Sequence, residues 1–543
     1  MAMKRVISAL LTAIFIVIYS VTCSAYGELP VSYDSRADGV ITSVKNQGDT
    51  GACWAFSTVS AIETDAIKQG LMSADDIDLS EAHLVWFTYN RSDDESDPLY
   101  GEGLYSSSPY ALGGNWARAA GTLARWSGLT NESDYPFDET LLGNYSESER
   151  YNRSAGLILN GVEILTSDDA VKDWILTHGS CTASILWSKN YENTETSSYY
   201  YNGSVRSTNH MITIIGWDDN YPASAFLSAP PADGAWLVKD SYGTEHHDGG
   251  YYHLSYYDKN LSAFAGYSVR PSSDFDVNYT YNGAGFSPCM SHSSGATAAN
   301  IYESRCSESL RAVSFYTADP NTEATVRIYT GLDENAVDPT AYSCVYETQQ
   351  TFAHQGYHTV DLAQPVELAA QTRFAVAVTY SHSKGSVYIP VERLNTETSG
   401  CAYRYSEGQS VCMFGDKRDA WCDASEIGVG NFYIQAFTLR KVPEITLSGS
   451  ATEVLYLMPV SFTAEAVNLY DLEWHISADD VTASEDGTYT VRAKDDYEVY
   501  CTGRDIDGNT VESARIKVTV KNGIFHKIWS WFIRMFEKIR NFF

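Results

Sequence analysis

Hydrophobic and polar positions follow helical spacing near the start of the chain and strand spacing further on. A run of small and apolar residues from Cys53 to Ser57 predicts the first turns of a buried helix. Residues 79–90 predict a second helix, for which Ser80 is a suitable N-cap. Short apolar runs then follow at 156–165, 179–187, 210–217, 234–243 and 249–258. This order indicates a domain with a helical first half and a β-rich second half.

The chain keeps the strand pattern until its last twenty residues. Runs at 310–317, 324–331, 356–362, 373–380, 385–391 and 431–439 are separated by turns of Gly, Asn, Asp and Ser. They predict an all-β sandwich domain at residues 275–440. Residues 443–521 predict a smaller sandwich of immunoglobulin type, which we interpret as a spacer. Residues 524–543 predict an amphipathic helix, with Lys527, Arg534 and Lys538 opposite the apolar positions.

The first 25 residues have the pattern of a secretory signal peptide. Lys4 and Arg5 precede an apolar run, and small residues follow as far as Ala25. The apolar run, residues 6–21, is short for a membrane-spanning helix. We therefore expect cleavage after Ala25 and a secreted or extracellular protein, which can be associated with the cell surface.

The charge of the chain excludes one class of partner. Its formal net charge is −32, and removal of Lys4 and Arg5 with the signal peptide changes −32 to −34. Such acidity argues against binding of nucleic acid, and against binding of anionic membranes by the body of the protein. The basic stretch at 524–543 is the exception. A peripheral membrane contact through this helix is one interpretation, and packing on the protein's own body is the other.

The cysteines fall into two groups. The chain has ten, of which one lies in the predicted signal peptide. Six lie in the predicted sandwich domain: Cys289, Cys306, Cys344, Cys401, Cys412 and Cys422. In an exported protein these six predict up to three disulfide bonds, whose pairing the sequence does not give. Cys181 is expected to be a small buried residue, and Cys53 a free thiol.

The position of Cys53 is that of a nucleophile. A thiol at the N-terminus of a helix lies in the positive end of the helix dipole, which favours the thiolate. The surrounding sequence, QGDTGACWAFS, resembles the active-site segment of the papain family of cysteine peptidases, and the resemblance extends upstream to residue 29. It implies a two-lobed α+β fold at residues 26–270, with a helical lobe and a β-barrel lobe. It also implies that Gln47 forms the oxyanion hole with the backbone N–H of Cys53.

Two further residues match the family's order. His210 begins a predicted strand, and Asp240 follows another in the sequence WLVKDSYGT. The resemblance implies that His210 exchanges the proton of Cys53 and that Asp240 orients the imidazole. The family has asparagine at the place of Asp240 and tryptophan at the place of Tyr242. A carboxylate still accepts a hydrogen bond from the imidazole, but it raises the pKa of the histidine. We therefore predict an active enzyme with a displaced pH profile.

Other positions are expected to contact the substrate. Gly113 and Gly114 precede a predicted helix and resemble the glycine pair along which the family binds an extended peptide. Trp54 and Tyr242 are also assigned to substrate binding. Neither a metal nor a cofactor is expected.

These observations predict an exported cysteine endopeptidase that acts on proteins or peptides. The domain at 275–440 resembles, in SLRAVSFYT and ATVRIYTGL, the lectin-like domain of exported bacterial peptidases, which implies a carbohydrate or cell-envelope ligand. Two alternatives remain open. One is a surface adhesin or glycan-binding protein with a catalytically degenerate peptidase fold, and the other is a transpeptidase or amidase that uses the same thioester chemistry.

Overall fold

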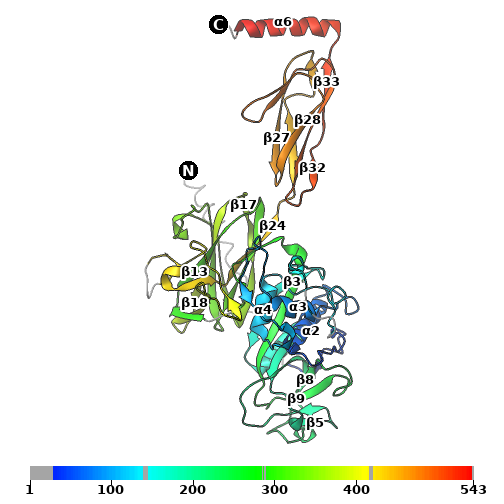
Figure 1. Cartoon of the computed structure of the whole chain (residues 1–543), viewed down its shortest axis with the longest axis vertical. Coiled ribbons are helices and arrows are strands. Elements are labelled where there is room, and N and C mark those ends of the chain that lie inside the picture. The colour runs from blue at the N-terminus through cyan, green and yellow to red at the C-terminus, as the bar shows by residue number, and fades with distance from the viewer. Residues whose placement is uncertain are drawn as a thin grey trace, which may run out of the picture.

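The structure, a computed structural model, describes residues 29–138, 143, 145–283, 285, 289–414 and 420–540. The predicted signal peptide lies outside this part. Figure 1 shows a mixed α/β domain and a β domain beside it, with an elongated β module beyond them that ends in a helix. We call them the first domain (residues 29–271), the second domain (residues 277–440) and the third module (residues 444–521).

The first domain is built around one buried helix. Helix α2 begins at Cys53, and its residues are buried as far as Ala66. Small side chains such as Ala55, Ser57 and Ala61 let the sheet and the other helices approach it closely. The predicted N-cap is confirmed, since the Ser80 side chain accepts a hydrogen bond from the backbone N–H of His83. The described helices are α2 (Cys53–Lys68), α3 (Glu81–Thr88), α4 (Trp116–Ala124), α5 (Asp168–His178) and α6 (Ile524–Arg540).

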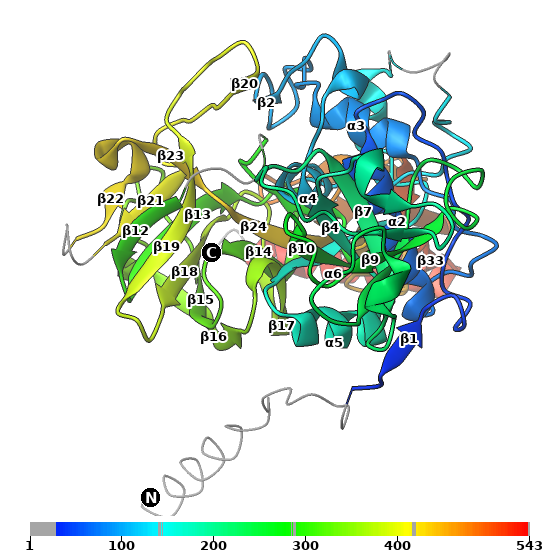
Figure 2. The ribbon, with the colours of Figure 1, turned by 90° about the horizontal axis from the view of Figure 1, so that it is seen from below.

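One sheet runs through the first and second domains. Its order is β11-β24-β14-β17-β3-β10-β4-β7-β8-β9-β6-β5, and β1 pairs with β7. The strands are β11 (Val277–Tyr279), β24 (Ile434–Arg440), β14 (Glu308–Thr317), β17 (Gln355–Leu368), β3 (Leu157–Leu165), β10 (Ser262–Pro271), β4 (Cys181–Ile185), β7 (His210–Asp218), β8 (Ala235–Lys239), β9 (Tyr251–Ser255), β6 (Ser198–Tyr199), β5 (Glu192–Asn193) and β1 (Ser32–Asp34). The two domains therefore share backbone hydrogen bonds. They lie side by side in Figure 2.

The junction of the two domains lies between β3 and β17. Val162 pairs with Tyr357, and Glu163 with Gly356. Gly356 has a φ of 153°, and a β-carbon there would lie 1.8 Å from the carbonyl oxygen of Val162. Only glycine allows this approach, so the pairing of β17 with β3 requires glycine at position 356.

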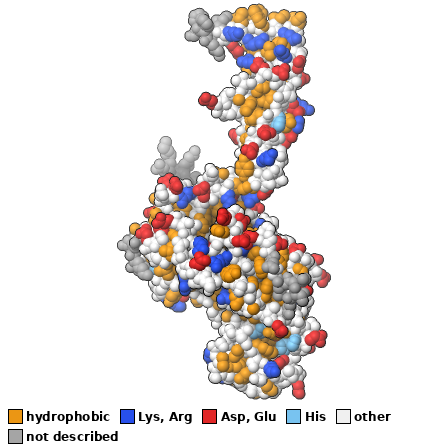
Figure 3. All heavy atoms as spheres, in the orientation of Figure 1, with side chains coloured by type: hydrophobic (Ala, Val, Ile, Leu, Met, Phe, Trp, Pro, Cys, Tyr) orange, Lys and Arg blue, Asp and Glu red, His pale blue; other side chains and the backbone are white. Residues whose placement is uncertain are grey.

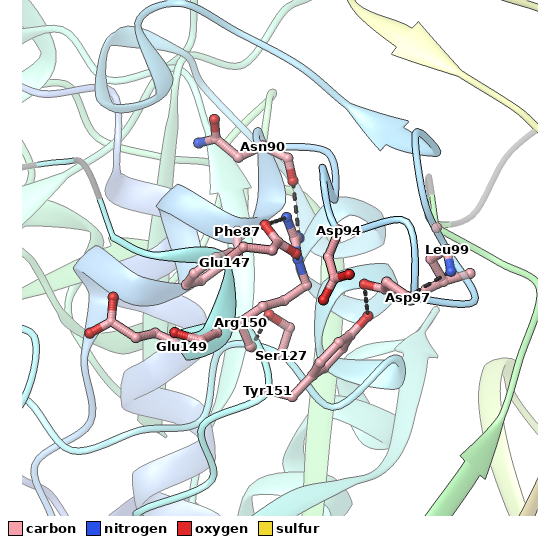
Figure 4. A network of polar contacts seen from close by, with 12 residues as sticks. Phe87, Asn90, Asp94, Asp97, Leu99, Ser127, Glu147, Glu149, Arg150 and Tyr151 are labelled. Atoms are coloured by element: carbon pink, nitrogen blue, oxygen red, sulfur yellow. Dashed lines mark hydrogen bonds and ion pairs between the residues drawn. The ribbon is translucent and has the colours of Figure 1, made fainter.

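A loop of the first domain forms a second junction. Strand β2 (Gly103–Leu104) pairs with β20 (Cys401–Ala402) of the second domain. The chain that leads to β2 is fastened by Arg150, which is buried and donates to the carbonyl of Asn90 at 3.0 Å (Figure 4). Tyr151 donates to the carboxylate of Asp97 in the same loop at 2.9 Å. Polar contacts within the first domain thus fix the loop, and the pairing of β2 with β20 joins it to the second domain.

The second domain is all-β, and its remaining sheets enclose a large apolar core. They have the orders β16-β15-β18-β13-β21-β22 and β12-β19-β23. The strands are β12 (Cys289–Ser293), β13 (Ala296–Glu303), β15 (Thr322–Thr330), β16 (Ser343–Phe352), β18 (Arg373–Ser381), β19 (Ser386–Arg393), β21 (Ser410–Met413), β22 (Cys422–Asp423) and β23 (Val429–Phe432). An α+β domain followed by all-β domains confirms the predicted fold class.

The disulfide bonds predicted for this domain do not occur within the described residues. Cys289, Cys306, Cys344, Cys401 and Cys422 are free thiols. Cys412 and Cys422 lie opposite each other on β21 and β22, with 3.8 Å between their sulfur atoms. A disulfide requires about 2.05 Å. The apolar core stabilises the part of the domain that the structure describes.

The third module has two small sheets around its own core. Their orders are β25-β27-β30-β29 and β26-β33-β31-β28, and β32 pairs with β31. The strands are β25 (Glu444–Gly449), β26 (Glu453–Leu455), β27 (Val460–Val467), β28 (Tyr470–Ile476), β29 (Val481–Ala483), β30 (Tyr489–Val491), β31 (Tyr497–Arg504), β32 (Thr510–Glu512) and β33 (Ile516–Lys521). Helix α6 follows β33 directly. Among the described residues, no helix combines the length and the apolar character that a membrane span requires.

Candidate active site

Cys53 is the first residue of α2, as the sequence predicts. No side chain caps the helix, and its first turn contains no acidic residue. The positive end of the helix dipole therefore acts on the thiol. The backbone N–H groups of Trp54 and Met211 also donate hydrogen bonds to the sulfur. Each of these features stabilises a thiolate at this position.

The sheet brings His210 and Asp240 together. His210 begins β7 and Asp240 follows β8, and these strands are antiparallel neighbours in which Thr213 pairs with Lys239. The start of β7 therefore lies beside the end of β8. His210 Nε2 donates to Asp240 Oδ1 at 2.8 Å, and both side chains are buried. The imidazole also makes a side-chain hydrogen bond with Cys53. One ring thus joins the thiol to the carboxylate.

The three groups shift one another's pKa values. Burial opposes ionisation of the Cys53 thiol, but the hydrogen bond and the charge of His210 outweigh it and lower the pKa of Cys53. Burial also opposes the charged form of His210, yet the charge and hydrogen bond of Asp240, with the interaction of Cys53, raise the pKa of His210 to about 10. The same contacts hold the pKa of Asp240 well below its ordinary value. The directions of these shifts favour a thiolate beside an imidazolium.

Gln47 is buried and fixed in one orientation. Its Oε1 accepts a hydrogen bond from the Ser241 hydroxyl at 2.7 Å, and its Nε2 donates to the Thr50 carbonyl at 2.9 Å. The amide nitrogen carries two hydrogens, so one remains for another acceptor. Ser241 directly follows Asp240, so one short segment supports both Gln47 and the carboxylate.

Comparison with known proteins agrees with this geometry. The family model described as papain family cysteine protease matches residues 29–271, and the model described as lectin like domain matches residues 278–438. The first domain is a papain-family cysteine protease domain. The second domain is a lectin-like domain.

Relatives among characterised proteins match the peptidase domain. Senescence-specific cysteine protease SAG12 of Arabidopsis thaliana is 28% identical over 251 residues, which cover 45% of this chain and 62% of that protein. Cathepsin S of Bos taurus is 27% identical over 249 residues, which cover 45% of this chain and 65% of the cathepsin. The chain thus spans less than two thirds of the length of these relatives.

A solved structure matches both domains together. The cysteine protease and lectin-like domains of Cwp84, a surface layer associated protein of Clostridium difficile, align with a TM-score of 0.64 and 25% identity. The alignment covers 76% of this chain and 90% of that one. The pairing of a papain-like domain with a lectin-like domain is therefore shared with a protein of known structure.

The residues predicted to bind substrate have different environments in the peptidase domain. Gly114 packs on the ring of Trp54, and a β-carbon on it would lie 2.4 Å from that ring. Trp54 is fully buried, so it supports Gly114 from below and does not itself reach a substrate, which differs from the prediction. The carbonyl of Gly113 accepts from Tyr89 at 2.5 Å and from Arg118 at 2.8 Å. Gly114 is thus the better candidate for backbone contact with a peptide.

Tyr242 lies over the imidazole of the peptidase domain. Its ring stacks on His210, with 5.2 Å between ring centres and an angle of 18° between planes. This partly buried ring shields the hydrogen bond between His210 and Asp240 from water. It contributes to the site through His210, whereas the sequence assigned it to substrate binding.

The sequence analysis missed two polar residues. His247 Nε2 donates to Asp240 Oδ2 at 3.1 Å, and His247 Nδ1 donates to Glu192 Oε1 at 3.0 Å. The pair HH at 246–247 is the sole sequence signal for this contact, and it gives no indication of Glu192, 55 residues upstream. Within the described residues, His, Cys, Asp and Glu side chains form no group of three or more suited to a metal ion.

Proposed function

We propose that this protein is a cysteine endopeptidase that hydrolyses peptide bonds with Cys53 as nucleophile and His210 as general acid and base. The observation that carries the proposal is the buried chain of hydrogen bonds from Cys53 through His210 to Asp240. It combines a thiol of lowered pKa with an imidazole of raised pKa. Such perturbed pairs are typical of catalytic sites.

The reaction proceeds in two halves. The Cys53 thiolate attacks the peptide carbonyl carbon, and the developing oxyanion accepts hydrogen bonds from Gln47 Nε2 and the backbone N–H of Cys53. The His210 imidazolium gives its proton to the leaving nitrogen as the C–N bond breaks, which leaves a thioester. His210 then takes a proton from water, the hydroxide attacks the thioester, and the carboxylic acid product leaves as the thiolate is restored.

The activity is tested by digestion of denatured casein. We expect the wild-type protein to release peptides under reducing conditions and the Cys53→Ala variant to release none above background. Cys181→Ala is the matched control, because this thiol is buried and burial raises its pKa, which removes it from nucleophilic chemistry. Activity that survives in Cys53→Ala would contradict the proposal.

The pKa values also favour an enzyme over the adhesin alternative. A scaffold without activity has no use for a thiolate beside an imidazolium. The transpeptidase alternative differs only in the acceptor, so it is separated by adding an amine to the casein digest. Hydrolysis products alone support the endopeptidase, and amine-capped peptides support the transfer reaction.

We further propose that the protein acts outside the cell on protein substrates and binds carbohydrate through its lectin-like domain. The predicted signal peptide supports export, and the similarity to a surface layer associated protein supports a place at the cell surface. The shared sheet holds the two domains in one fixed arrangement. A glycan bound to the second domain would therefore keep the catalytic site at a set distance from the envelope.

A membrane surface is the proposed partner of helix α6. Its large apolar side chains are exposed by between 43% and 82%: Ile524, Phe525, Ile528, Trp529, Trp531, Phe532 and Phe536. Ser530, on the other side of the helix, is fully buried, and Lys527 covers the ring of Tyr456 in the third module. The apolar face thus points away from the protein, as the outer edge of α6 in Figure 3 illustrates. This argues against the alternative that α6 packs its apolar face on the body.

The basic residues of the same helix select the partner. Lys527, Arg534 and Lys538 lie on the face opposite the apolar positions, in a protein that is otherwise strongly acidic. An anionic lipid surface matches both the apolar area and the charge. A neutral surface offers only the apolar contact and does not attract the basic residues of α6.

Vesicle flotation tests this contact. We expect the full chain to bind vesicles of phosphatidylglycerol and phosphatidylcholine, and Phe525→Ser/Trp529→Ser to bind at least about tenfold more weakly. Replacement of Lys527 and Lys538 by Gln should weaken binding by about fivefold per charge. Val442→Ser, which removes an exposed apolar side chain outside the helix, is the control. Equal binding to pure phosphatidylcholine would contradict the role of charge, and unchanged binding of the Phe525/Trp529 variant would contradict the contact.

A further inference from the structure

His247 is held between two carboxylates behind the catalytic histidine. One ring nitrogen lies 3.1 Å from Asp240 Oδ2 and the other lies 3.0 Å from Glu192 Oε1. The His247 side chain is only 4% exposed, and Asp240 is buried as well. The mechanism described above uses neither His247 nor Glu192. A buried polar cluster of this kind requires an explanation, because each member is costly to bury unless all are satisfied.

The two contacts determine the protonation state of the ring. A neutral imidazole has one N–H and one acceptor nitrogen, so it cannot donate to two carboxylates at once. Only the imidazolium satisfies both. Burial opposes this charge, but the hydrogen bond and charge of Asp240, followed by those of Glu192, raise the pKa of His247. The two contacts therefore favour the cationic form of His247.

The other groups around His247 do not compete for its protons. The ring of Tyr252, on β9, lies 4.7 Å away, and the ring of Trp187 meets it edge-on at 5.3 Å. His246, the neighbour in the loop, has its ring centre 6.5 Å away and is exposed. Tyr252 remains neutral, since burial raises its pKa well above the ordinary value. The charges that face His247 are thus the two carboxylates and, beyond Asp240, His210.

The backbone is also constrained at this position. His247 has a φ of 56°, a left-handed conformation that a residue with a β-carbon adopts at a cost. The loop is tied back to the site by a hydrogen bond from the Asp240 N–H to the Gly250 carbonyl at 2.9 Å. The fold therefore holds the His247 backbone in an unfavourable conformation, in which both nitrogens of the ring form hydrogen bonds.

We propose that His247, fixed by Glu192, is a positioning residue that orients the Asp240 carboxylate and offsets its negative charge. Oδ2 of Asp240 is held by His247, which turns Oδ1 toward His210 Nε2. Without the second cation, the full charge of Asp240 would act on His210 alone. The proton on His210 would then be held too tightly for transfer to a leaving nitrogen. The inference rests on the proposed function, because it concerns the same proton.

A double-mutant cycle tests the proposal. The rate of alkylation of Cys53 by iodoacetamide is measured against pH by the mass of the peptide that contains it, in parallel with casein hydrolysis. The variants are His247→Gln, Asp240→Asn and the double variant, with His246→Gln as the matched control. Because His247→Gln removes a positive charge, we expect the alkaline limb of both profiles to move upward by about one pH unit. It should also lower kcat more than it changes KM.

The cycle separates the proposed role from simple packing. In the Asp240→Asn background there is no carboxylate charge to offset, so His247→Gln should cause no further shift of the limb. His246→Gln should match the wild type. An equal shift in both backgrounds, or no shift in either, would overturn the proposal. Thermal unfolding of each variant shows whether a loss of rate reflects partial unfolding. Partial unfolding would lower the maximum rate in both profiles but would not move their alkaline limb.

Failure of the proposed function gives a different result. If Cys53 alkylates with a single ionisation in the ordinary thiol range and casein is not cleaved, the endopeptidase assignment is wrong. The inference is then judged by NMR titration of His210 in the same variants. A His247→Gln shift that depends on Asp240 supports it, and an absent shift overturns it.

Discussion

Replacement of His210 by Ala is expected to lower kcat/KM for peptide hydrolysis by about 10⁴-fold or more. Without the imidazole, the Cys53 thiol loses its hydrogen bond and the neighbouring positive charge, while burial remains. Its pKa should therefore rise to or above the ordinary thiol value, which removes the thiolate at neutral pH. The measurement is initial rates on a peptide substrate, together with the pH dependence of Cys53 alkylation.

The result has a matched control in the same domain. His83 is also buried, but it lies in α3 and bonds the carbonyl of Glu149 at 2.9 Å, away from the catalytic groups. We expect His83→Gln to lower thermal stability and to leave the alkylation profile of Cys53 in place. A His210→Ala variant that kept the wild-type profile would show that another group activates the thiol.

Replacement of Gln47 by Ala is expected to lower kcat by about 10²- to 10³-fold, with little change in KM. The amide stabilises charge that exists only on the tetrahedral intermediate, so its loss affects the transition state more than the bound substrate. The contacts of Gln47 with Ser241 and Thr50 hold its amide in one orientation. Steady-state kinetics on one peptide substrate measure the effect.

Gln47→Glu sharpens the same test. The carboxylate has the same size but places negative charge beside the oxyanion, so we expect a larger loss of kcat than with Gln47→Ala. Alkylation of Cys53 should persist in both variants, because the His210 contact is intact. An effect of Gln47→Ala on KM alone would contradict the oxyanion role.

The sequence allowed the fold class to be predicted, and it named three candidate catalytic residues that the structure brings together. Cys53 at a helix start and His210 at a strand start depend on local patterns that can be read without the fold. Asp240 follows a buried strand, and the antiparallel pairing of β7 and β8 then brings it to His210. The resemblance to the papain family, carried by these local segments, assigned their roles, and each of the three residues stands at the end of a regular element.

The remaining parts of the site depend on contacts between distant segments. Glu192 meets His247 only because β5 and the loop after β8 converge at one edge of the sheet. Trp54 follows the nucleophile in sequence, yet the helical turn directs it into the core beneath Gly114. No periodicity or motif in a single sequence encodes such convergence.

The second domain shows the same limit. The number of cysteines predicted up to three disulfide bonds, whereas Cys289, Cys306, Cys344, Cys401 and Cys422 are free thiols in the part of the chain that the structure describes. The continuous sheet through β3 and β17 was also not predicted, because its pairing joins segments about 200 residues apart. The pairing of strands from different domains depends on how the domains pack, which a local sequence pattern does not indicate.

The most direct test of the account is intact-mass labelling of the reduced wild-type protein with an epoxide inhibitor of papain-type enzymes. We predict one adduct, located on Cys53, and none on Cys53→Ala or His210→Ala. A wild-type protein that resists the epoxide, while iodoacetamide still reaches Cys53, would show that the thiol is accessible but not activated. That result would contradict the central claim that Cys53 and His210 form a catalytic pair.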